Sequence, residues 1–227
     1  MKTYDKNKPL ISIHIPKTGG SGFREILENW FAADLYFHYF DEKNNRMPEK
    51  HHLRPGICIH GHFNRGRNFG IKHYYPEADQ FITFLRDPFE IVVSRYFFEK
   101  KRETVSRSFR GGKPLNLTSD IDRYLDEELR KKDYHPNILD YMPVEITLDN
   151  YKQVIDEYFI YIGIVEDFQC SLDKLAAKLK FPAFAVELLN KSERFVDFSL
   201  EYRERFRETH PCEYAIYNYV SENYKKW

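Results

Sequence analysis

The chain has 227 residues, which is enough for one α/β domain with a substantial core and too few for two domains of ordinary size. Lysine plus arginine and aspartate plus glutamate each number 35, so the net charge is zero and excludes global attraction to nucleic acid or a membrane surface. Any anion binding must therefore be local. The three cysteines, Cys58, Cys170 and Cys212, have no metal-binding spacing and predict buried thiols in a reducing compartment.

No segment of the sequence predicts export or membrane insertion. Residues 1–9 are polar, and the apolar run at 10–15 is too short for a signal-peptide core or a membrane span. The sequence contains no internal repeat, low-complexity tract or linker that would divide it. We therefore expect a cytoplasmic protein with a single domain over residues 1–227 and no membrane span.

Residues 10–31, LISIHIPKTGGSGFREILENWF, are the most informative stretch of the chain. Residues 10–15 are nearly all apolar and β-branched, which predicts a strand that is buried on both faces and ends at Pro16. The apolar residues that follow have the spacing of one helix face, at Phe23, Ile26, Leu27, Trp30 and Phe31. The KTGGS segment is therefore a strand-to-helix turn.

Such a turn is suited to binding a phosphate group. Gly19 and Gly20 allow positive φ and a close approach to a ligand, and the first N–H groups of the helix carry the positive end of its dipole. Lys17 adds a mobile positive charge, while Thr18 and Ser21 add hydroxyl donors. An unrelated tight turn can also use two glycines, but the unbroken order of strand, Lys, Thr, Gly, Gly, hydroxyl and helix favours a phosphate site.

A second strand, predicted at 56–59, runs directly into His60, Gly61 and His62. Side chains at i and i+2 of an extended chain lie on the same side, so both imidazoles should face one way, with Gly61 leaving room for a ligand. The carboxyl ends of strands in doubly wound sheets are where ligands bind. A lone histidine at such a position would favour a structural role.

Adjacent histidines also occur at His51 and His52, on a polar segment at 41–55 that predicts a loop. Neither cysteine nor carboxylate ligands lie nearby at the spacing of a zinc site. We interpret these two histidines as solvated side chains.

The next buried strand is predicted at 80–85, QFITFL, and an RDP segment that contains Arg86 follows it. Asp is a good N-cap and Pro is favoured at the first helical position, which predicts a helix from there to about Arg102. Arg86 then lies at the end of the strand, and Ser94 lies about two turns into the helix. The structural alternative for Arg86 is an ion pair at the helix start, for example with Glu90.

The rest of the chain alternates helix-like and strand-like patterns. Helices are predicted at 120–132, 149–158, 165–179 and 199–224, the last with a break near Pro211, and further strands at 34–40 and 159–164. Residues 100–117 are basic around a GGKP turn and predict a mobile loop. The overall pattern predicts an α/β fold, with a P-loop-like parallel sheet of about four to five strands flanked by helices.

The order of these motifs resembles that of sulfotransferases that use 3′-phosphoadenosine 5′-phosphosulfate (PAPS). A Walker A loop places its lysine after the glycines, whereas PKTGGS places Lys17 before them. The KTGGS turn, the HGH segment and the RDPFEIVVS segment together are similar to the carbohydrate branch of the family, which includes heparan sulfate 2-O-sulfotransferase. The chain departs from that pattern at Gly22, where relatives often have a second hydroxyl residue.

The resemblance implies a role for each matching residue. His62 would be the general base with His60 as its supporting partner, and Lys17 would stabilise the leaving group. Contacts to PAPS would come from Lys17, Thr18, Gly19, Gly20, Ser21 and Gly22 at the 5′-phosphosulfate, Arg86 and Ser94 at the 3′-phosphate, and Lys191 and Ser192 in a segment that closes over the nucleotide. The implied product is adenosine 3′,5′-bisphosphate (PAP), and the reaction needs no metal.

Several alternatives stay open in the sequence. The acceptor hydroxyl could belong to a saccharide, a lipid-linked glycan, a polyketide or a phenol, and the resemblance favours a saccharide. Residues 100–113, with Arg107, Arg110 and Lys113, predict either plain surface or a lid that attracts an anionic acceptor. If His62 is not the base, Glu166 or His14 comes next.

Two other classes of function compete with sulfuryl transfer. One is a P-loop-type small-molecule kinase, which would bind ATP with magnesium. The other is a catalytically silent nucleotide-binding module, in which the histidine pair would be dispensable.

Overall fold

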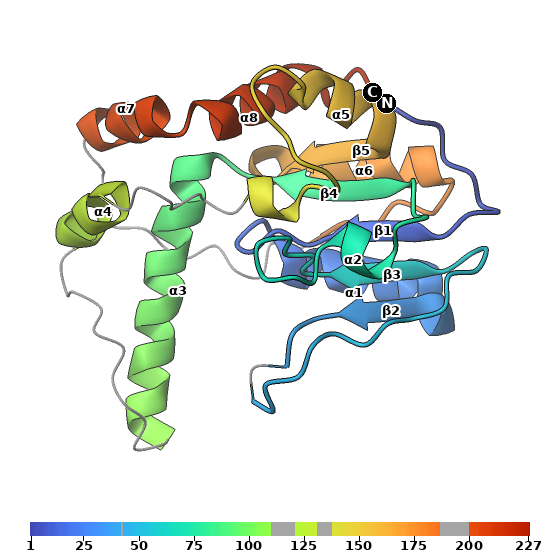
Figure 1. Ribbon diagram of the computed structural model, residues 1–227, viewed down its shortest axis with the longest axis horizontal. Coiled ribbons are helices and arrows are strands. Elements are labelled where there is room, and N and C mark those ends of the chain that lie inside the picture. The colour runs from blue at the N-terminus through green and yellow to red at the C-terminus, as the bar shows by residue number, and fades with distance from the viewer. Residues whose placement is uncertain (42, 110–120, 131–137, 187–199) are drawn as a thin grey trace.

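The computed structural model describes residues 1–41, 43–109, 121–130, 138–186 and 200–227. These residues form a single α/β domain around one parallel sheet with the strand order β2-β3-β1-β4-β5 (Figure 1). The strands are β1 Leu10–Ile13, β2 Leu35–His38, β3 Cys58–Gly61, β4 Phe81–Leu85 and β5 Phe159–Ile164. The predicted α/β fold with a parallel sheet of four to five strands is confirmed.

The strand order creates a switch point between two central strands of the sheet. Since neighbouring strands all pair in parallel, their carboxyl ends share one edge of the sheet, here called the carboxyl edge, opposite the amino edge. The chain leaves β1 toward β2 but leaves β4 toward β5, so the connections diverge between β1 and β4. Ligands of doubly wound sheets bind at such a switch point.

The helices largely match the predicted segments. They are α1 Gly20–Phe31, α2 Ile71–Tyr74, α3 Pro88–Phe109, α4 Ile121–Arg130, α5 Tyr151–Tyr158, α6 Phe168–Leu179, α7 Leu200–Thr209 and α8 Pro211–Asn223, with 3-10 turns at Ala32–Asp34, Leu139–Tyr141 and Val165–Asp167. The predicted break near Pro211 separates α7 from α8. The short helix α2 was not predicted, because a single turn has no periodicity to detect.

The helix that follows the phosphate-type turn packs as its apolar spacing predicts. Phe23, Leu27 and Phe31 of α1 are buried, and Phe23 lies 4.7 Å from Phe84 of β4, measured between ring centroids. Phe84 also contacts Phe168 of α6 at 4.9 Å, so α1 and α6 cover the same face of the sheet. This packing fixes the direction of α1, whose first turn then points to the carboxyl edge.

The helix α3 corrects one prediction. It continues to Phe109, whereas the sequence predicted an end near Arg102 and a loop over 100–117. The reason is local, because residues 102–109 contain neither glycine nor proline and nothing stops the helix before the GGKP segment. Arg107 therefore belongs to a helix, while Arg110 and Lys113 lie outside the described residues.

A second, smaller core lies beside the main one. Phe89, Val92 and Val93 of α3 pack with Leu125 of α4, Phe206 of α7 and Tyr214 of α8. Figure 1 shows α3 standing across the carboxyl edge, with α4 and α7 beside it. The carboxyl edge thus lies between the sheet and this second core.

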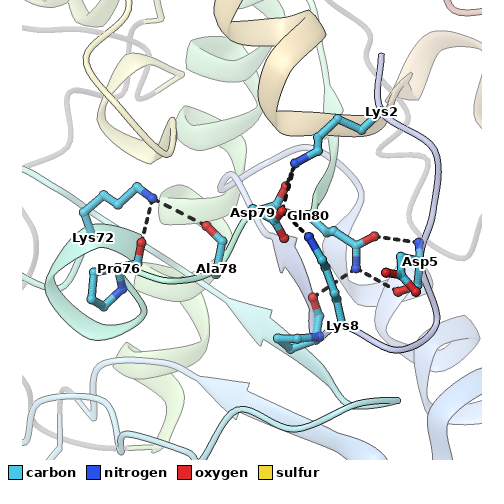
Figure 2. Close-up of polar contacts among 9 residues, drawn as sticks. Lys2, Asp5, Lys8, Lys72, Pro76, Ala78, Asp79 and Gln80 are labelled. Atoms are coloured by element: carbon cyan, nitrogen blue, oxygen red, sulfur yellow. Dashed lines mark hydrogen bonds and ion pairs between the residues drawn. The ribbon is translucent and has the colours of Figure 1, made fainter.

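The amino edge is closed by the start of the chain, as Figure 2 shows. The ammonium groups of Lys2 and Lys8 lie 3.1 and 2.7 Å from the Asp79 carboxylate. The side chain of buried Gln80 accepts a hydrogen bond from the Asp5 N–H at 2.7 Å and donates one to the Asp5 carbonyl at 3.0 Å. These contacts hold residues 1–9 against the strands.

Two composition-based predictions can be compared with the structure. All three cysteines are free thiols, but only Cys58 is fully buried, so the prediction of buried thiols is wrong for partly exposed Cys170 and Cys212. In the part of the chain that the structure describes, no helix combines the length and the apolar character needed to cross a bilayer.

Candidate active site

Each strand is followed by at least one polar residue at the carboxyl edge. His14 and Lys17 follow β1, and Tyr39 follows β2, while His62 follows β3. Arg86 follows β4 and Glu166 follows β5. Residues that are far apart in sequence therefore meet at one edge of the sheet, as parallel strands require.

The turn between β1 and α1 has the backbone of an anion site. Gly19 is the N-cap of α1 with φ 78°, a left-handed conformation that glycine adopts without strain. Among the described residues, no side chain caps α1 with a hydrogen bond, and its first turn, which includes Gly20, Ser21 and Gly22, carries no acidic residue. Its first N–H groups therefore present a positive helix end to a ligand.

Two side chains shape this turn from within. The hydroxyl of Thr18 donates to the carbonyl of Ile15 at 2.8 Å, and Thr18 is only 2% exposed. Lys17 has a φ of 71°, which is uncommon for a residue other than glycine, and its ammonium lies 4.0 Å from the centre of the Phe98 ring on α3. The hydroxyl of Thr18 thus supports the shape of the turn in this structure.

Arg86 connects the turn to the start of α3. Its guanidinium donates to the Lys17 carbonyl at 3.2 Å and also lies 3.6 Å from one carboxylate oxygen of Glu90. The other oxygen of Glu90 accepts a hydrogen bond from Arg203 of α7. The ion pair that was the structural alternative for Arg86 is therefore present, together with a contact to the phosphate-type turn. Ser94 lies further along α3 and is partly exposed.

Glu166 supports the same corner of the site. Its carboxylate accepts a hydrogen bond from the N–H of Asp87 at 2.8 Å, which ties the end of β5 to the start of α3. Burial raises the pKa of Glu166 above the ordinary value for a glutamate.

His60 is held inside the sheet. Its Nδ1 lies 2.9 Å from the hydroxyl of Ser12, its neighbour in the register of β1 and β3, and its side chain is fully buried. Burial lowers the pKa of His60 to about 3, so its imidazole is neutral. Its Nε2 is buried without a hydrogen-bond partner among the described residues.

His62 has a defined tautomer. Its Nδ1 lies 2.6 Å from the carbonyl oxygen of His14. A carbonyl can only accept a hydrogen bond, so Nδ1 of a neutral His62 carries the proton and Nε2 carries the lone pair. His62 is partly exposed at the carboxyl edge.

The His14 ring joins the histidine pair to the phosphate-type turn. It stacks on His62 at 4.4 Å and on His60 at 5.3 Å between ring centroids, and its Nδ1 lies 3.0 Å from the Tyr39 hydroxyl. A Cβ at position 20 would lie 1.8 Å from His14 Nε2, so only glycine fits beside this ring. Burial, followed by the nearby His62, His60 and Lys17, lowers the pKa of His14 well below 6.5.

Three other sequence interpretations have structural outcomes. A Cβ on Gly61 would lie 2.0 Å from the His38 carbonyl, so Gly61 makes room for β2 and not for a ligand. His51 donates to the Phe37 carbonyl at 3.0 Å, and the described residues contain no group of three or more side chains that could hold a metal. Lys191 and Ser192 lie outside the described residues.

The sequence reasoning missed part of this site. It named His14 only as a substitute base and did not name Tyr39 or Ser12. Ser12 could have been noticed, because it is a polar residue in an otherwise apolar strand. The contact between Tyr39 and His14 spans 25 positions and has no local signal.

Comparisons with known proteins support the class of fold. A scan against models of protein families finds no match, and a search of curated proteins finds none either. The single-domain α/β architecture with its five-strand parallel sheet is the P-loop-like fold of the sulfotransferases. A similar solved structure is that of mouse sulfotransferase SULT7A1 complexed with PAP, at a TM-score of 0.52 and 16% identity, over 96% of this chain and 90% of that one.

Proposed function

We propose that the protein transfers a sulfuryl group from PAPS to an acceptor hydroxyl. The observation that carries the proposal is the meeting of a lysine-containing anion turn, Arg86 and the HGH pair at the switch point of this fold. The similarity to a sulfotransferase that was solved with PAP supports the same class of reaction. The HGH segment favours the carbohydrate branch and hence a saccharide acceptor, which could be anionic.

The donor set fits a nucleotide with a phosphate group at each end. The N–H groups at the start of α1, together with Lys17, would hold the 5′-phosphosulfate. Arg86 and Ser94 would hold the 3′-phosphate, and Lys191 and Ser192 would complete the cover. Arg86 must then exchange Glu90 for the phosphate, and Arg203 keeps that carboxylate paired when it does.

The reaction moves SO₃ in line between two oxygens, so positioning and charge stabilisation are the main tasks. The bond between sulfur and the bridging phosphate oxygen breaks, and its electron pair stays on PAP. A new bond forms between sulfur and the acceptor oxygen, and the acceptor proton passes to Nε2 of His62. Lys17 has a flexible stem, so its ammonium can move from Phe98 to the bridging oxygen as charge grows there.

The test begins with ligand binding. Thermal unfolding is measured with PAP alone and with ATP plus magnesium, and we expect PAP to stabilise the protein more. Sulfur-35 PAPS is then offered to a panel of sulfated, carboxylated and neutral saccharides and of phenols. Stabilisation by ATP plus magnesium and not by PAP would indicate the kinase class instead, and PAP binding without transfer to any acceptor or to water would indicate a silent module.

A further inference from the structure

The ring of His14 lies between the proposed phosphosulfate site and the proposed base. On one side it touches Gly20, in the first turn of α1, where the 5′-phosphosulfate would bind. On the other side it stacks on His62, the proposed base, at 4.4 Å between centroids. A sulfuryl group that travels from the turn to an acceptor held by His62 must pass close to this ring.

The hydrogen bonds of His14 define which ring nitrogen can meet that group. The Tyr39 hydroxyl lies 3.0 Å from Nδ1, and burial raises the pKa of Tyr39, so it stays a phenol. A phenol donates well, and the structure gives this hydroxyl no partner other than His14 among the described residues. Donation from Tyr39 to Nδ1 places the proton of the neutral ring on Nε2.

The neutral state of the ring has a physical cause. His14 lies against two other imidazoles and close to Lys17, and it is largely shielded from water. A second positive charge beside Lys17 would be repelled, so the ring acts as an uncharged donor. A neutral imidazole that donates to a reacting oxygen is an established use of histidine in enzymes.

We propose that His14 is a further catalytic residue, whose Nε2–H donates a hydrogen bond to a non-bridging oxygen of the sulfuryl group during transfer, and that Tyr39 is its positioning residue. This inference rests on the proposed function. His14 gains and loses no proton in it, so the atoms and electrons balance as in the transfer itself. The role differs from that of His62, which takes the acceptor proton.

The experiment compares three variants, His14→Ala, His14→Gln and Tyr39→Phe, with Tyr36→Phe as the matched control. Tyr36 is on the same strand β2, and its ring contacts His51 and not His14. PAP affinity is measured by calorimetry. Transfer is measured with water as the acceptor, as the amount of sulfur-35 sulfate that forms from labelled PAPS. PAP lacks the sulfuryl group, so its affinity shows whether a variant still binds the nucleotide normally.

We expect PAP affinity to be unchanged in every variant and transfer to fall by about 10²- to 10³-fold in His14→Ala, the effect of removing one such donor. His14→Gln should recover part of the rate, because an amide N–H can also donate. Transfer by Tyr39→Phe should fall less than transfer by His14→Ala, since the ring can then adopt either tautomer and only one of them donates from Nε2. Nitrogen-15 spectra of the imidazoles should show Nε2 of His14 protonated in the unchanged protein and a mixture in Tyr39→Phe.

Two results would overturn the inference. The first is transfer at the unchanged rate in both His14 variants. The second is a parallel loss of PAP affinity and transfer, since His14 would then only shape the turn. Failure of the unchanged protein to bind PAP is a separate outcome, which would contradict the proposed function itself.

Discussion

At the amino edge of the sheet, Lys2 and Lys8 share Asp79, and Gln80 satisfies both backbone groups of Asp5 (Figure 2). At the carboxyl edge, by contrast, His60 Nε2 is buried without a partner among the described residues. Unsatisfied polar groups are often found where a protein acts on a ligand. The two edges therefore differ in how completely their polar groups are satisfied.

The amino edge also carries a hollow in the protein surface. A hollow of about 380 Å³ lies at the amino edge, lined in part by Lys8, Arg54 and Asp79. Three of its charged side chains already have protein partners, since Arg54 bonds Asp34 and Lys8 bonds Asp79. The side chains that surround this hollow therefore do not favour it over the carboxyl edge as the proposed site.

The largest expected difference between the edges is in reaction rate. His62→Ala should lower transfer by about 10²- to 10⁴-fold, the usual contribution of a general base, and leave PAP affinity unchanged. His60→Ala should lower the rate of transfer less, because His60 does not contact the acceptor in the proposed mechanism. Rates with saturating PAPS are the measurement, and Asp79→Asn at the amino edge is the control. Normal turnover by His62→Ala would show that the base lies elsewhere, with Glu166 next.

The second prediction concerns the 3′-phosphate. Arg86→Ala should weaken PAP binding by about 1.5 to 3 kcal/mol, because charge-assisted hydrogen bonds are lost. Binding of adenosine 5′-phosphate should weaken less, because Arg86 meets the phosphate-type turn only through the Lys17 carbonyl. Calorimetry with both nucleotides makes the comparison, and Arg54→Ala at the amino edge is the matched arginine control. If the unchanged protein bound PAP and adenosine 5′-phosphate with equal affinity, the assignment of Arg86 and Ser94 to the 3′-phosphate would be contradicted.

The third prediction uses the neutral buried histidines. The folded-state pKa is about 3 for His60 and about 4 for His38, below the ordinary 6.5. As pH falls from about 6.5 to about 4, the unfolded chain gains protons that the folded chain does not bind, so stability is lost at up to about 1.4 kcal/mol per pH unit for each histidine. Urea unfolding across this range measures the slope.

A variant separates these histidines from other acid-sensitive groups. His38→Gln keeps a donor for the Phe69 carbonyl, which His38 Nε2 meets at 3.1 Å, but it cannot titrate. Its stability should therefore depend less steeply on pH than that of the unchanged protein. An identical slope in both proteins would mean that His38 does not contribute.

The smallest effect is expected at the amino edge. Asp79→Asn should lower the free energy of unfolding by at most about 1 kcal/mol, because the carboxylate is 39% exposed and its ion pairs are screened by solvent. Transfer should not change. A loss of rate in this variant, measured beside thermal unfolding, would contradict the separation of the two edges.

The sequence predicted what depends on neighbouring residues. The order of strand, KTGGS turn and amphipathic helix is local, and α1 buries the predicted face from Phe23 to Phe31. It could not predict that the ring of His14 would lie between Gly20 and His62, because that placement depends on the pairing of β1 with β3. The sequence also predicted that Gly61 leaves room for a ligand. The sheet shows instead that β2 fills that space.

The contact between His14 and Gly20 has a consequence for sequence variation. Any side chain at position 20 would collide with the imidazole, so position 20 can change only if position 14 changes as well. We expect related chains that carry a residue larger than glycine at position 20 to carry something other than histidine at position 14. The two substitutions should likewise be coupled in this chain, with Gly20→Ala tolerated better after His14→Ala than before it.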